Sequence, residues 1–146
     1  MNIYIDSSAL VKRYLTEPGT EAVQGLFGGP DAVAGSALTA VEVPSAISRA
    51  KRAGIVKAAD ATRAIALFQG DWARFVRIPV DDRRLDAAAV LAERHCLRAL
   101  DAVHLASALS WAEAIAGAVV LATFDRELWL AAREAGLAPW PQGLVP

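Results

Sequence analysis

The sequence is poor in cysteine and histidine. Its 146 residues include one cysteine, Cys96, and two histidines. A single cysteine excludes an internal disulfide and fits a reducing cytoplasm. Because Cys96 adjoins His95 and the sequence has no second such pair, the ligand spacing of a structural zinc site is also missing. An apolar core therefore has to hold the protein together, and a hydrophobic fraction of 55% is enough to form one.

A strong excess of charge is missing as well, since the formal net charge is −1. A protein of this charge can still bind nucleic acid if its cations gather on one face. No basic stretch precedes the first apolar residues, so we expect no secretory signal. Residues 102–124 are apolar enough to consider a membrane span, but His104 and Glu113 lie among them and Gly117 divides them. We expect no membrane segment there, and a single domain over residues 1–146.

Short apolar runs alternate with amphipathic segments along the chain. The runs predict strands at residues 3–5, 32–35, 76–80 and 119–123. Capping residues and periodicity predict helices at residues 9–15, 21–27, 39–52, 57–75, 81–94, 101–116 and 125–135. The tail after Pro139 is too rich in proline and glycine for a firm assignment. The alternation predicts an α/β fold with a mainly parallel central sheet.

Four acidic residues stand at strand ends or helix starts. Asp6 follows the first predicted strand and Asp125 the fourth, while Glu42 and Asp101 lie near the starts of helices. Ligands of open α/β sheets gather outside the carboxyl ends of the strands, so these side chains should meet at one edge. Clustered carboxylates repel one another unless a cation joins them. Oxygen ligands alone favour Mg²⁺ or Mn²⁺.

Each acid also has a purely structural interpretation. Asp6 and Asp125 could each cap a helix. Glu42 falls three residues after Thr39, which matches a capping box, and Asp101 could favour a helix start through the helix dipole. Singly, none of these positions is specific; their joint placement is what indicates a metal site.

Four segments resemble the PIN-domain family, in particular the VapC-type toxins of bacterial toxin–antitoxin pairs. They are residues 3–12 (IYIDSSALVK), 38–43 (LTAVEV), 97–106 (LRALDAVHLA) and 123–137, which begins TFDREL. The acidic positions match throughout, whereas residues 54–80 match only in general character.

The resemblance implies a three-layer α/β/α sandwich, Mg²⁺-dependent or Mn²⁺-dependent RNA cleavage, a partner antitoxin and a homodimer. Asp6, Glu42, Asp101 and Asp125 would be both metal ligands and catalytic residues. The bound ion would lower the pKa of a water molecule and orient it on the scissile phosphate, so that water is the nucleophile. The antitoxin is expected to cover the apolar groove beside the helices starting at Ala9 and Thr39, with an arginine or lysine reaching the acids.

Several neighbours of the acids are further candidates. Ser8 and Thr123 could orient a carboxylate or the attacking water. Arg98, and with it Lys12 and Arg13, could contact RNA phosphates. His104 lies three residues after Asp101 on the same helix face; we interpret it as a packing histidine behind the site, with general base as the alternative.

Three other functions fit an acidic cluster. A phosphatase with Asp6 as nucleophile would want a second aspartate two residues later, where Ser8 stands. A receiver-like signalling domain would want a lysine near its end, but the last quarter of the sequence contains none. A PIN fold that binds RNA without cleaving it would not need the intact acidic set.

Overall fold

A five-stranded parallel sheet forms the centre of the molecule. The computed structural model describes residues 1–145. The strands lie in the order β3-β2-β1-β4-β5, and each neighbouring pair is parallel. Their bounds are β1 (Asn2–Ile5), β2 (Ala32–Ser36), β3 (Val76–Ile78), β4 (Val119–Ala122) and β5 (Ala138–Trp140). The predicted parallel α/β sheet is confirmed.

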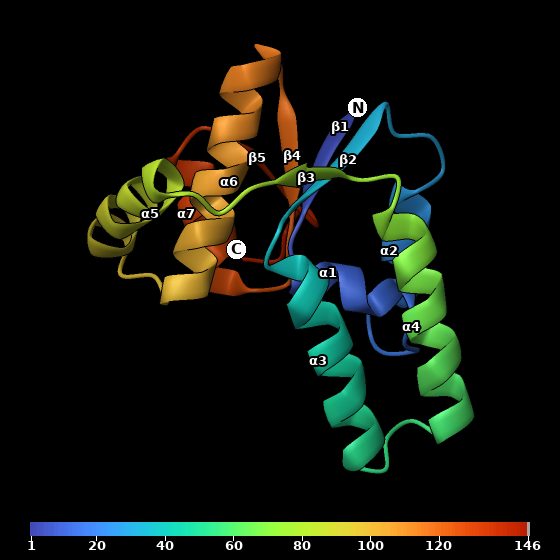
Figure 1. Ribbon diagram of the computed structural model, residues 1–146. Helices are drawn as coiled ribbons and strands as arrows, with labels where there is room; N and C mark the ends of the chain where they lie inside the picture. Colours follow the sequence, from blue (N-terminus) through green and yellow to red (C-terminus); the bar gives the residue numbers. More distant parts are fainter. Residues whose placement is uncertain (146) are drawn as a thin grey trace.

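Helices cover both faces of this sheet (Figure 1). One apolar cluster joins the sheet to the first four helices, and a second joins it to the last three. The first set is α1 (Ser7–Leu10), which continues as the 3-10 turn η1 (Val11–Arg13), then α2 (Thr20–Leu26), α3 (Thr39–Arg52) and α4 (Ala58–Trp72). The second is α5 (Asp82–His95), α6 (Ala99–Ile115) and α7 (Arg126–Glu134). The three-layer α/β/α sandwich is therefore confirmed.

The central strand β1 shows why the core has two halves. Successive side chains of a strand point to opposite faces. Ile3 and Ile5 accordingly pack with α1–α4, and Tyr4 packs with α5–α7. All three are fully or almost fully buried. A strand buried on both faces ends directly at Asp6, which places that carboxyl group at the carboxyl edge of the sheet.

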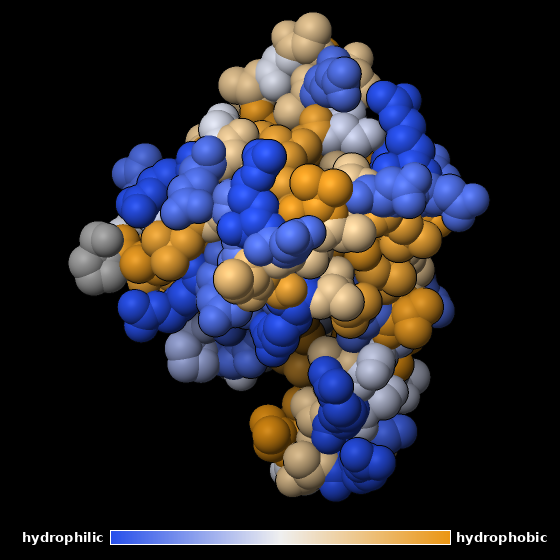
Figure 2. Space-filling model, turned by 90° about the vertical axis from the view of Figure 1, so that its left-hand side faces the viewer, coloured by the Kyte–Doolittle hydropathy of each residue, from blue (hydrophilic) through white to orange (hydrophobic). Residues whose placement is uncertain are grey.

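Helices α3 and α4 form an arm that extends away from the sheet (Figure 1). Gly54, with φ of 75°, lies in the turn between them, a backbone conformation that glycine adopts without strain. Figure 2 shows the arm projecting below the body of the molecule. The base of α3 carries Glu42, so the arm also forms one wall of the acidic cleft described below.

Most element boundaries differ from the expected ones by a few residues. The expected helix 9–15 begins at Ser7 and changes to a 3-10 turn at Val11. The strand β5 was missed, because its central residue, Pro139, weakens the strand pattern; an edge strand tolerates proline, since only one side of it pairs. Within residues 1–145 no helix combines the length and the apolar character needed to cross a membrane.

Candidate active site

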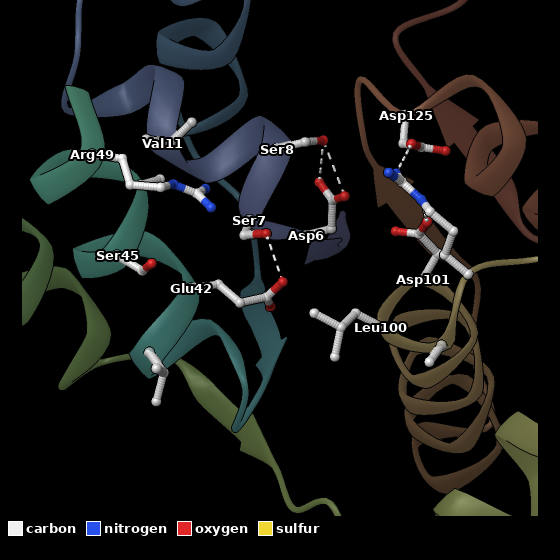
Figure 3. A pocket seen from close by; sticks show the side chains of 14 residues that line it. Asp6, Ser7, Ser8, Val11, Glu42, Ser45, Arg49, Leu100, Asp101 and Asp125 are labelled. Atoms are coloured by element: carbon white, nitrogen blue, oxygen red, sulfur yellow. Dashed lines mark hydrogen bonds and ion pairs between the residues drawn. The ribbon is translucent and has the colours of Figure 1, made fainter. Parts of the chain in front are cut away.

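The four acidic residues line one cleft at the carboxyl edge of the sheet (Figure 3). Its volume is about 650 Å³. Asp6 follows β1 and Asp125 lies just beyond β4, and the pairing of Ile5 with Ala122 brings these strand ends together. Glu42 and Asp101 enter from the first turns of α3 and α6. The carboxyl groups thus come from both helical layers and line the same cleft at the carboxyl edge of the sheet.

Asp6 is the most buried of the four, with 3% of its surface exposed. Its Oδ1 accepts hydrogen bonds from the backbone N–H of Ala9 (3.0 Å) and the hydroxyl of Ser8 (2.8 Å), and its Oδ2 accepts one from Thr123 Oγ1 (2.9 Å). It therefore caps α1 while its carboxylate lines the cleft. Burial raises the pKa of Asp6, although the charge of His104 and these hydrogen bonds oppose the shift.

Ser8 and Thr123 also connect Asp6 to the loop that carries Asp125. The Ser8 hydroxyl accepts the backbone N–H of Phe124 (2.9 Å), and Thr123 Oγ1 accepts that of Asp125 (3.0 Å). The two hydroxyls lie 3.3 Å apart. Both residues therefore lie where the sequence placed them, beside the acidic group that they were expected to orient.

Glu42 is held from both sides of the cleft. Ser7 Oγ donates to its Oε2 (3.1 Å), and its Oε1 lies 2.7 Å from His104 Nε2. The capping-box interpretation is wrong, because α3 is capped at Leu38 and the carboxylate of Glu42 faces the cleft instead of the helix backbone. Burial opposes ionisation of Glu42, but the hydrogen bond and charge of His104 outweigh it, so the pKa of Glu42 is lowered.

His104 is buried behind the site, with 1% of its surface exposed. Its ring contacts Glu42 through Nε2 and the hydroxyl of Tyr4 through Nδ1 (2.9 Å). Burial alone would lower the pKa of His104. The hydrogen bond to Glu42 and the charge of Asp6 outweigh burial, so the pKa is raised. The expected buried histidine is present, but it touches a site residue as well as packing in the core.

Arg98 joins the two remaining acids. Its Nε donates to Asp101 Oδ2 (3.0 Å) and its Nη2 donates to Asp125 Oδ2 (2.8 Å). The other oxygen of Asp125 accepts the backbone N–H of Leu128 and caps α7. Burial raises the pKa of Asp101, the charge of Asp125 raises it further, and Arg98 opposes both. The guanidinium therefore offsets part of the negative charge in this half of the cleft.

The other predicted phosphate contacts lie elsewhere. Lys12 pairs with Glu17 (3.3 Å) and lies over the ring of Phe124, while Arg13 pairs with Asp71 (2.7 Å). Neither lines the cleft. Arg49, from the third turn of α3, lines it instead, beside Ser45 (Figure 3).

The donor set fits a divalent cation by chemistry, because it consists of carboxylate oxygens. Within residues 1–145, however, no three acidic, histidine or cysteine side chains lie close enough together to hold a metal ion. The contacts explain this spacing. Arg98 engages Asp101 and Asp125, while Ser7 and His104 engage Glu42. Arg98 thus already pairs with two of the four carboxylates.

Comparison with known proteins assigns the family. The PIN-domain model matches residues 3–134. The chain is 34% identical to Ribonuclease VapC45 of Mycobacterium tuberculosis over 144 residues, which cover 99% of this chain and 98% of that protein. The chain therefore belongs to the PIN-domain family, among its VapC ribonucleases.

Solved structures agree on the fold. The crystal structure of VapC20 of Mycobacterium tuberculosis, described as a sarcin-ricin loop cleaving toxin, has a TM-score of 0.66 at 16% identity over 92% of this chain and 95% of that one. A toxin–antitoxin complex from Klebsiella pneumoniae has a TM-score of 0.56 at 19% identity, covering 81% of this chain and 83% of that one.

Sequence reasoning missed two residues around the acids, Ser7 and Tyr4. Ser7 directly precedes the expected Ser8, and its hydroxyl donates to Glu42 instead of Asp6. Arg49 is one of several basic residues of the sequence that could form a rim around the acids; it lies seven residues after Glu42, two helical turns along the same face, and that spacing distinguishes it from the others. Tyr4 sits inside an apolar strand, where its hydroxyl group gives no local signal.

Proposed function

We propose that this protein is a metal-dependent endoribonuclease that hydrolyses RNA phosphodiester bonds and is the toxin of a toxin–antitoxin pair. The observation that carries the proposal is the set of four carboxylates lining one cleft at the carboxyl edge of the sheet. The relationship to a protein named Ribonuclease VapC45 supports RNA as the substrate class. A cytoplasmic location stays a prediction.

The proposed ligands of Mg²⁺ or Mn²⁺ are Asp6, Glu42, Asp101 and Asp125. An ion held by these carboxylates would supply a water molecule of lowered pKa and positive charge for the scissile phosphate. Ser8 and Thr123 keep the Asp6 carboxylate turned to the cleft. Burial raises the pKa of Asp6, and a divalent ion bound beside it would favour its charged form.

Arg98 and Arg49 are the proposed phosphate-binding residues. The side chain of Arg98 is 73% exposed and pairs with Asp101 and Asp125, two of the proposed metal ligands. Displaced from these acids by a metal ion, its guanidinium would be free to bind an RNA phosphate. Arg49 faces the cleft from the opposite wall (Figure 3). We no longer propose Lys12 and Arg13 for this role, because both are engaged away from the cleft.

An antitoxin is the proposed protein partner, and structural similarity to a toxin–antitoxin complex supports it. Apolar side chains beside the acids could receive an apolar segment. Val41 and Leu100 are 70% and 51% exposed and line opposite walls of the cleft. A cationic side chain from that segment could reach the carboxylates between them. The expected homodimer also stays a prediction.

The covalent phosphatase is disfavoured by the contacts of Asp6. Ser8, which stands where such an enzyme would want a second aspartate, donates its hydroxyl to Asp6 and supplies no second carboxylate. A PIN fold that only binds RNA would show no cleavage in the assay below.

The test is cleavage of a panel of structured RNAs by purified protein with Mn²⁺ or Mg²⁺. We expect specific cleavage that EDTA abolishes and that added metal restores. Asp101→Asn provides the control for a contaminating nuclease, because it should be inactive in the same preparation. Undiminished cleavage after thorough chelation would reject the metal site, and binding without cleavage would favour the silent RNA-binding alternative.

A further inference from the structure

A line of hydrogen bonds runs from the sheet to Glu42. The backbone N–H of Ser36 donates to Tyr4 Oη (3.1 Å), Tyr4 Oη bonds to His104 Nδ1 (2.9 Å), and His104 Nε2 bonds to Glu42 Oε1 (2.7 Å). Tyr4 and His104 are 0% and 1% exposed. The line begins on β2, crosses β1 and α6, and ends at a carboxylate on α3.

The chemistry of these groups fixes the direction of the last bond. An ionised carboxylate only accepts hydrogen bonds, so Nε2 of His104 has to carry the hydrogen. Tyr4 Oη already accepts the backbone N–H of Ser36 and has one hydrogen of its own to donate. An unprotonated Nδ1 of His104 can accept that hydrogen. If the ring were doubly protonated, Nε2 would still donate to Glu42. The contact therefore exists in either charge state of the ring.

Glu42 needs this support more than Asp6 and Asp125 do. Asp6 and Asp125 are short side chains, and each is fixed by a backbone N–H of the helix that it caps. Glu42 has one more rotatable bond, and within residues 1–145 its carboxylate receives only the bonds from Ser7 and His104. Its orientation in the cleft therefore depends on two side chains from α1 and α6.

We propose that His104 is a positioning residue that holds the Glu42 carboxylate in its metal-binding orientation, and that Tyr4 fixes the ring of His104 from behind. This inference rests on the proposed function. Partners that orient a ligand carboxylate in this way contribute about 10–100-fold to metal affinity or activity. His104 acts through Glu42 and does not need to touch the substrate.

Two substitutions of His104 separate positioning from packing. In His104→Gln the terminal amide reaches the place of Nε2 and can still donate to Glu42. In His104→Asn the amide reaches only the place of Nδ1, so the contact with Tyr4 can survive while that with Glu42 is lost. We expect His104→Asn to weaken Mn²⁺ binding in calorimetry, and RNA cleavage, by about 10–100-fold. His104→Gln should recover most of both. Equal losses in the two variants would overturn the proposal.

A double-mutant cycle tests whether His104 acts through Glu42. Adding His104→Asn to Glu42→Ala should cause no further loss of Mn²⁺ affinity, because the group that it positions is already gone. A further loss as large as that of the single variant would overturn the proposal. Thermal unfolding of each metal-free variant shows whether it is folded. If His104→Asn does not fold, Tyr4→Phe tests the same line, and it should weaken Mn²⁺ binding in the same direction.

Nuclear magnetic resonance of the metal-free protein gives an independent readout. The sequence has only two histidines, so their ring nitrogens can be assigned. We expect a hydrogen on Nε2 of His104, and a ring that carries it only on Nδ1 would overturn the proposal. Wild-type protein that neither binds Mn²⁺ nor cleaves RNA would reject the proposed function itself. An active wild type with an unchanged His104→Asn variant would reject only the positioning role.

Discussion

The guanidinium of Arg98 donates a 2.8 Å hydrogen bond to the carboxylate of Asp125, 27 residues further along the chain. Arg98 is the N-cap of α6 and Asp125 is the N-cap of α7, so the bond ties together the starts of two helices at the edge of the cleft. The same guanidinium pairs with Asp101. The protein thus places its own cation against two of the four proposed metal ligands.

Substitution of Arg98 should change metal and RNA binding in opposite directions. In Arg98→Gln, no guanidinium competes for Asp101 and Asp125, so Mn²⁺ affinity measured by calorimetry should rise. Affinity for an RNA that is not cleaved should fall, and the slope of log affinity against log salt should decrease by about 1 if one phosphate contact is lost. Arg126→Gln removes an exposed charge outside the cleft and is the matched control. A fall in Mn²⁺ affinity for Arg98→Gln would contradict the competition.

Asp101→Asn should abolish cleavage while leaving the metal-free fold as stable as the wild type, or more stable. The pKa of Asp101 is raised, which means that its surroundings in the folded protein disfavour the charged form despite Arg98. Neutralising it should therefore relieve repulsion from Asp125. Urea unfolding in EDTA measures the stability. A clear loss of stability would indicate that the Asp101 carboxylate stabilises the start of α6 more than it repels Asp125.

Two substitutions of Asp125 should affect activity equally but stability differently. Asp125→Asn and Asp125→Ala both remove the charge, and both should abolish cleavage. Only asparagine keeps an oxygen that can accept the backbone N–H of Leu128 and cap α7. Asp125→Ala should therefore lower the free energy of unfolding by about 0.5–2 kcal/mol, whereas Asp125→Asn should change it little. Equal stability of the two variants would show that the cap contributes nothing measurable.

The metal-free protein should lose stability as the pH rises from the acidic range. The folded pKa values of Asp6 and Asp101 are raised above 3.8, so above that pH the folded state holds more protons than the unfolded state. Stability is then lost as the pH rises through the folded values. The pKa of His104 is also raised, so above pH 6.5 the stability that its protonated ring contributes is lost as the pH rises further. Glu42, whose pKa is lowered, contributes stability that is lost only as the pH falls below about 4.5.

Urea unfolding in EDTA across this pH range checks the prediction. In Asp101→Asn the free energy of unfolding should change less with pH in the acidic range. Its change above pH 6.5, which is due to His104, should stay the same. In saturating Mn²⁺ the trend should reverse, because the ion binds deprotonated carboxylates and its stabilisation increases with pH. A metal-free protein that becomes steadily more stable from pH 4 to 7 would contradict the raised pKa values.

The antitoxin should insert a cation among the acids. Co-expression of the partner should rescue growth of cells that make the toxin. Replacing the inserted arginine or lysine of the partner by alanine should weaken inhibition more than it weakens binding, because the apolar contacts beside the cleft persist. A complex whose acidic cleft is empty and open to solvent would reject this mechanism but not the nuclease activity.

Local sequence signals were sufficient for much of the site. A buried strand that ends at an acidic residue, followed by a helix, can be recognised within ten residues, and this pattern located Asp6. The pattern at Asp125 is similar. An N-cap side chain bonds to a backbone N–H two or three residues later, so the sequence also indicated that Asp6 and Asp125 could each cap a helix. Both residues do so in the structure. Capping and lining the cleft are compatible because a carboxylate has two oxygens.

The sequence by itself determined the alternation of strands and helices, the parallel sheet and the edge at which the acids meet. These follow from periodicity and from short-range hydrogen bonds. Only the tertiary structure decided that Glu42 turns to His104, 62 residues away, and that His104 turns to Tyr4, 100 residues away. It also decided that Arg98, although its side chain is largely exposed, pairs with Asp101 and Asp125. Such contacts depend on how two helical layers meet across the sheet, and that geometry leaves no periodic or local signal in the chain.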